Sequence, residues 1–86
     1  MSTATGERLS GVAILARRDA KLISRRVINH AETASRLAQV LGGTGTPAEV
    51  EVRRACKEAI AHAHDLQRTV SDLHDTVQYY VRSKGL

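Results

Sequence analysis

The residues best suited to chemistry in this chain are four histidines and one cysteine. His30 stands in the stretch RVINHAETASRL, where the helical pattern calls for an apolar residue. An imidazole can act as a general base, a phosphoryl acceptor or a metal ligand. The sequence offers no acid to orient it, because Glu32 would lie on another face of a helix. We therefore expect His30 to be half-buried and hydrogen-bonded rather than reactive.

Possible metal ligands lie in the second half of the chain. Glu58 and His62 are one helical turn apart and Asp65 follows, but His64 would point in another direction. The Glu-x-x-His motif of di-iron bundles is absent from the sequence. Cys56 has no second cysteine and falls in an apolar pattern, where a thiol behaves as a small hydrophobic group. We predict no metal, no cofactor and no catalytic residue.

The clearest structural signals end one helix and start another. In the stretch LGGTGTPAEVE, Gly42 and Gly43 are suited to the left-handed conformation that closes a helix. Thr46, Pro47 and Glu49 follow as an N-cap, a first helical residue and the acid of a capping box. These signals predict a single domain over residues 1–86, with helices over about 7–41 and about 47–83 and a glycine-rich turn at 42–46.

Both predicted helices carry apolar residues at alternating steps of four and three, which is the spacing of a coiled-coil seam. Folding at the turn would put the seams in register, with Ile23 opposite Leu66 and His30 opposite Ala59. The expected fold class is all-α, an antiparallel, coiled-coil-like two-helix hairpin. The seam residues are Leu9, Ala13, Ala16, Ala20, Ile23, Val27, His30, Ala34, Leu37 and Leu41, and Val52, Cys56, Ala59, Ala63, Leu66, Val70, Leu73, Val77 and Tyr80.

The outward sides of the two helices differ in character. The second helix is polar there, from Arg54 to Gln78, and should be solvated, whereas the first carries aliphatic and basic residues. A chain of 86 residues without Trp or Phe also has little material for a core of its own. We therefore expect two hairpins to form a homodimeric four-helix bundle through this face, or a partner to dock there. The candidate contact residues are Ile14, Leu15, Arg18, Lys21, Leu22, Arg25 and Ile28.

The positive charge of the chain is concentrated in its first half. Of a net charge of +4, residues 1–45 hold seven Arg and Lys against three acidic residues, and residues 46–86 hold six of each. An acidic protein surface or a nucleic acid would be attracted to the first helix. The basic cluster of this helix lacks the interleaved aromatic residues that would stack on the bases of a nucleic acid. The cluster consists of Arg17, Arg18, Lys21, Arg25 and Arg26.

The sequence also bears on where the protein resides. No apolar run approaches the roughly 20 residues of a membrane span, and the first residues, MSTATGERLSG, lack the pattern of a signal peptide. A single cysteine fits a reducing compartment. We expect a soluble, cytoplasmic protein that does not bind membranes.

Two stretches, LISRRVINHAETASRL and EVRRACKEAIAHAHDL, resemble the dimerisation and phosphotransfer hairpin of sensor histidine kinases. In the branch whose acceptor segment reads His-Arg-x-x-Asn, Arg26, Val27 and Asn29 match, while Arg25 replaces the phosphoacceptor histidine. The resemblance implies a hairpin and a dimeric four-helix bundle but not catalysis. In a degenerate relative, His30 could act as a displaced acceptor only if it faced solvent, whereas the seam puts it inside. The length also resembles secreted hairpins of type VII secretion, whose Trp-x-Gly turn is here Gly-Gly-Thr-Gly.

From these observations we expect a non-enzymatic helical interaction and assembly module. It would self-associate and dock a macromolecular partner through the basic, partly apolar first helix. The alternatives are a histidine-phosphotransfer-like signalling protein that uses His30 and a small basic protein that binds nucleic acid.

Overall fold

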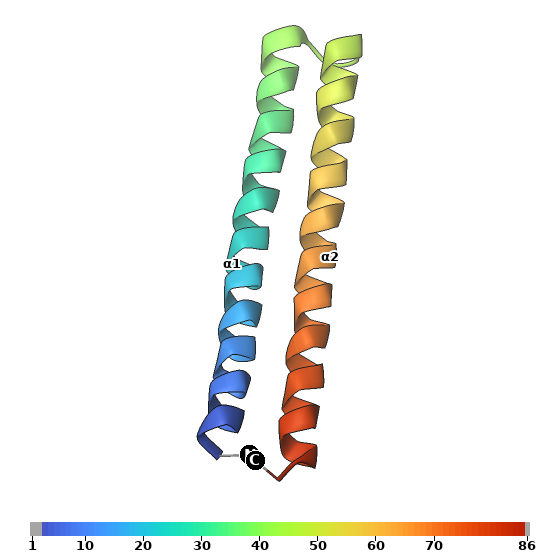
Figure 1. Ribbon diagram of the computed structural model, residues 1–86. Helices are drawn as coiled ribbons and strands as arrows, with labels where there is room; N and C mark the ends of the chain where they lie inside the picture. Colours follow the sequence, from blue (N-terminus) through green and yellow to red (C-terminus); the bar gives the residue numbers. More distant parts are fainter. Residues whose placement is uncertain (1–2, 86) are drawn as a thin grey trace.

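The computed structural model describes residues 3–85, of which 93% are helical and none lies in a strand. Within that range, helix α1 (Thr3–Gly42) and helix α2 (Pro47–Ser83) lie antiparallel and side by side (Figure 1). The hairpin is a rod of 60 × 14 × 11 Å with the turn at one end. The predicted all-α two-helix hairpin is confirmed, although α1 begins at Thr3 and not near residue 7.

The turn is built from the residue types that predicted it, except that Gly42 is the last residue of α1 and does not take the expected left-handed conformation. Gly43 and Gly45 have positive φ angles of 81° and 87°, which side chains with a Cβ rarely adopt. Thr46 is the N-cap of α2, where its hydroxyl accepts a 3.3 Å hydrogen bond from the Glu49 N–H. Pro47 follows in the first turn of the helix, where its missing N–H costs nothing. Local sequence alone therefore fixes the point at which the chain reverses.

Half of the expected capping box is not formed. The Glu49 side chain is buried, and its carboxylate makes no hydrogen bond back to the N-cap. It lies instead 3.3 Å from the guanidinium of Arg53, one turn further along α2. This ion pair supplies the counter-charge that the buried carboxylate needs, beside the favourable N-terminal end of the helix dipole.

The two helices contact each other through small side chains. The buried apolar residues among those described are Ala13, Ala20, Ala31, Ala63 and Val81, and Ser24 is completely inaccessible. A helical alanine can be this deeply covered only when the neighbouring helix backbone comes close. The hairpin is therefore tightly packed but buries little apolar area.

On each helix, the residues that make the contact form a row that is shifted by one sequence position from the predicted seam. Ala13, Ala20 and Ala63 belong to both the predicted seam and the observed contact, but the large seam residues lie beside the contact. They are too bulky to fit between backbones that alanine and serine bring together. The exposed large aliphatic residues of the seam, which are 37–92% accessible, are Leu9, Ile23, Val27, Leu37, Leu41, Val52, Leu66 and Leu73. The predicted register is nevertheless present, because Ile23 and Leu66 line one groove.

Two glycines should respond in opposite ways to alanine. Gly43→Ala should lower the free energy of unfolding by about 1 kcal/mol, because alanine is strained at a positive φ. Gly11→Ala should raise it by about 0.5–1 kcal/mol, because the glycine is helical and a Cβ would meet nothing within 4 Å. Urea unfolding followed by circular dichroism at one protein concentration measures both. Equal effects would contradict the assigned turn.

Ser24 tests how closely the helices pack. Ser24→Leu should destabilise the hairpin by about 1–3 kcal/mol, because the serine is inaccessible at the helix contact and a larger side chain would push the helices apart. Ser24→Ala should be neutral or stabilising by up to about 1 kcal/mol, because the buried hydroxyl has no hydrogen-bond partner among the described residues. Thermal unfolding compares the two variants. A Ser24→Leu protein as stable as the wild type would mean that the helices lie further apart.

Candidate interaction surfaces

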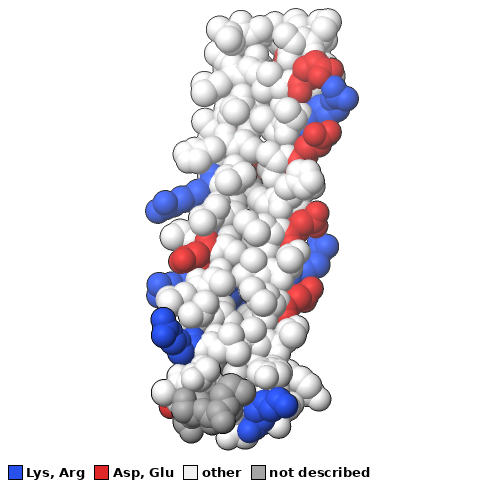
Figure 2. Space-filling model, viewed as in Figure 1, with Lys and Arg blue, Asp and Glu red and all other residues white. Residues whose placement is uncertain are grey.

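One face of the hairpin is an apolar groove that runs between the helices. It contains many of the large residues of the predicted seam, and none of the described residues that line it is Lys, Arg, Asp or Glu. Figure 2 shows a band almost free of charge along the middle of both helices, with charged side chains at the edges. We call this surface the apolar groove. Its large and exposed lining residues are Leu9, Val12, Ile23, Val27, His30, Val52, His62, Leu66 and Leu73.

The exposed surface of the chain is large for its mass. The accessible area is 6307 Å² for 9.4 kDa, whereas a compact folded monomer of that mass exposes about 5,000 Å². The excess of about 1,300 Å² reflects an elongated rod whose large aliphatic side chains stay half in water. A surface of this kind is typical of a chain that buries a face against another helix.

His30 lies on the wall of this groove and not between the helices. Its side chain is exposed, and no described residue forms a hydrogen bond with its ring. The expectation of a half-buried, hydrogen-bonded histidine was therefore wrong, for the same reason that moved Ile23 and Leu66 outward. His62 lines the groove from α2, also exposed. Among the described residues that line the groove, the ionisable side chains are these two histidines and half-buried Cys56.

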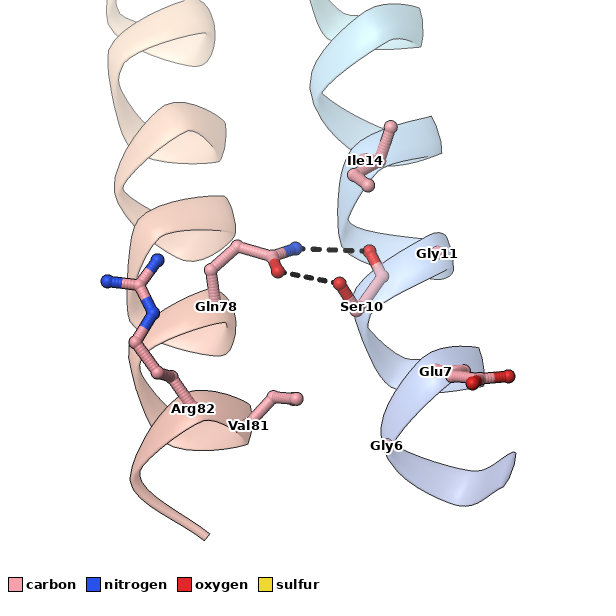
Figure 3. A pocket seen from close by; sticks show the side chains of 8 residues that line it. All are labelled: Gly6, Glu7, Ser10, Gly11, Ile14, Gln78, Val81 and Arg82. Carbon is pink, nitrogen blue, oxygen red and sulfur yellow. Dashed lines mark hydrogen bonds between the residues drawn. The ribbon is translucent and has the colours of Figure 1, made fainter. Parts of the chain in front are cut away.

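A polar clamp joins the helices at the open end, on the face opposite the groove (Figure 3). Ser10 Oγ donates a 2.6 Å hydrogen bond to Gln78 Oε1, and Gln78 Nε2 donates a 3.3 Å bond to the Ser10 carbonyl. The sequence placed Gln78 on a solvated surface, which is wrong, because the rotated contact line brings it to half burial. Together with the turn, this clamp fixes the register at both ends of the rod. The shallow pocket around it holds no nucleophile paired with a base.

The predicted contact residues of helix α1 form a second surface, which we call the outer ridge. Ile14, Leu15 and Leu22 are 46–47% exposed, and Ile28 is half-buried. The ridge is completed by the exposed cations Arg18, Lys21 and Arg25. Figure 2 shows Lys and Arg side chains that project from the outer side of α1.

The cations of the two helices differ in their pairing. On α2, Arg53, Arg54 and Arg68 each form an ion pair with a neighbouring carboxylate. On α1, no Arg or Lys in the described part of the chain is paired with a carboxylate. Arg17 points towards α2, where its guanidinium lies 3.2 Å from Nδ1 of His74, so it does not belong to the outer ridge. The outer ridge therefore keeps its full positive charge.

Other kinds of site find no support in residues 3–85. No group of three or more His, Cys, Asp or Glu within that range could hold a metal ion. Neither described helix has the length and apolar content required to cross a bilayer. No family model, curated protein or solved structure matches this chain.

Proposed function

We propose that this chain is a non-enzymatic assembly module in which the apolar grooves of two copies pack together into a four-helix bundle. One observation carries the proposal. Large aliphatic residues from both helices lie along a single face that the hairpin itself leaves half exposed. Such a face is stable in water only when another apolar surface covers it.

A second copy of the chain fits this surface well. A two-fold axis between two such faces pairs the aliphatic rows of one copy with those of the other, and their heptad spacing repeats on every helix. The small residues Ala16 and Ala59 alternate with Ile23 and Leu66 along the groove, so large side chains can enter spaces beside small ones. In the bundle, the residues of the predicted seam form the central core, and the alanine contact between α1 and α2 lies to the side of that core.

The chain exposes enough surface to form the interface of a stable homodimer. Specific interfaces bury about 800 Å² or more on each partner, and the chain exposes about 1,300 Å² beyond a compact monomer. The groove carries large aliphatic residues of both helices, whereas the exposed aliphatic residues of the outer ridge are Ile14, Leu15 and Leu22, so we assign self-association to the groove.

Charge placed in the groove should dissociate the bundle. Ile23→Glu and Leu66→Glu should each halve the mass measured by light scattering, because a carboxylate would be buried among aliphatic side chains. Leu22→Glu is the matched control, because Leu22 adjoins Ile23 and is similarly exposed, but lies on the outer ridge. Its mass should be unchanged. A monomeric wild-type protein would overturn the proposal, and a halved mass for Leu22→Glu would move the interface to the outer ridge.

Phosphotransfer through His30 is the second candidate, because the exposed ring is accessible to another protein. We expect no label when the chain is incubated with a phosphorylated response regulator, since no described residue orients the imidazole and the bundle would cover it. A label that disappears in His30→Gln but persists in His64→Gln, an exposed histidine outside the groove, would establish phosphotransfer instead.

A further inference from the structure

We propose that the outer ridge of α1 docks an acidic amphipathic helix of a partner protein. The ridge residues Ile14, Leu15, Arg18, Lys21, Leu22 and Arg25 lie outside the apolar groove. The surface is therefore available in the monomer and in the four-helix bundle alike. This inference does not depend on self-association through the groove.

The ridge has a short apolar centre. Leu15 and Leu22 are seven residues apart, so they lie in one line about 10 Å apart along the helix. Ile14 is equally exposed but lies on the neighbouring row of the helix, in line with Lys21. The next positions in the same line are Arg8 and Asn29, which end the apolar stretch on both sides. Two turns of a partner helix with aliphatic residues on one side would cover this centre.

Cations border the apolar centre. Arg18 lies within one turn of both leucines, and Arg25 lies one turn beyond Leu22. Lys21 is seven residues from Ile14 and adds a third positive charge on that side. None of the three is paired with a carboxylate among the described residues. Acidic side chains that flank the apolar side of a partner helix would therefore meet unneutralised cations.

The opposite border of the ridge is electrically balanced. Asp19 and Arg26 lie there, seven residues apart, and their charges cancel. The field of the ridge is thus directed to the side of Arg18, Lys21 and Arg25. A partner helix with acidic residues on both flanks would gain binding energy mainly from the flank that faces these three cations.

Other classes of partner use this surface less well. The phosphates of a nucleic acid would pair with the cations, but the leucines of the ridge would make no favourable contact with it. Both tyrosines of the chain are on α2, so no aromatic residue of α1 could stack on a base. A bilayer requires a wider apolar face than three aliphatic residues in two turns. Helix α2 of another copy is also a poor fit, because its outward row carries acids without aliphatic residues. That row is Glu51, Glu58, Asp65 and Asp72.

The test uses the full chain and a synthetic helical peptide of three heptads, with Leu at two positions of each heptad and Glu on both flanks. Fluorescence anisotropy should show binding that weakens with salt. Arg18→Glu combined with Arg25→Glu, and separately Leu22→Glu, should each weaken it about tenfold or more. The matched control is Arg54→Glu with Arg68→Glu, which makes the same change of charge on α2 and should leave binding unchanged.

Further arms separate this inference from the proposed bundle. Leu66→Glu, with its groove disrupted, should bind the peptide as the wild type does, whatever its mass. Absence of peptide binding would overturn the inference, as would an equal loss in the α2 control. Tighter binding to duplex DNA or to phosphatidylserine vesicles that Leu22→Glu leaves unchanged would assign the ridge to those ligands instead.

Discussion

Close packing of α1 against α2 through alanine and serine is the constraint on which the rest of the molecule depends. Ala20, Ser24 and Ala63 can be covered so completely only because the two backbones approach each other. Such a contact is specific in register but buries little apolar area. Because each Å² of buried apolar surface contributes about 25 cal/mol, the contact adds little to stability. Ordering two long helices costs about 1–2 kcal/mol for each residue's backbone. The hairpin therefore gains from any further surface that covers its remaining aliphatic side chains.

The same constraint gives the rod two apolar surfaces of different character. Because large side chains cannot enter the contact, Ile23 and Leu66 flank it and form an uncharged groove along both helices. Leu15 and Leu22 stand on the outer ridge of α1 among cations. An uncharged face of this length suits a permanent, desolvated contact, whereas a small charged one suits a partner that comes and goes. We therefore propose that assembly and docking use separate surfaces of one hairpin.

Charge divides between the helices in a way that supports this assignment. On α2, acids and bases alternate at helical spacing and neutralise each other in pairs such as Arg54 with Glu51. Such pairs contribute little stability at the surface but leave no net field. On α1 the excess of Arg and Lys has no such partners in the described part of the chain. An acidic partner would therefore be attracted to α1, the helix with the excess positive charge.

The amino-acid sequence by itself determined two helices, their turn and their register. Those features depend on local chemistry: apolar spacing, the positive φ of Gly43, and the Thr46 cap. Only the tertiary structure decided which of two adjacent rows on each helix makes the contact. Periodicity cannot separate rows one residue apart, because the aliphatic row and the alanine and serine row both follow the steps of four and three. The choice depends on how near the backbones come, and it moved His30 to the surface and Gln78 to the interface.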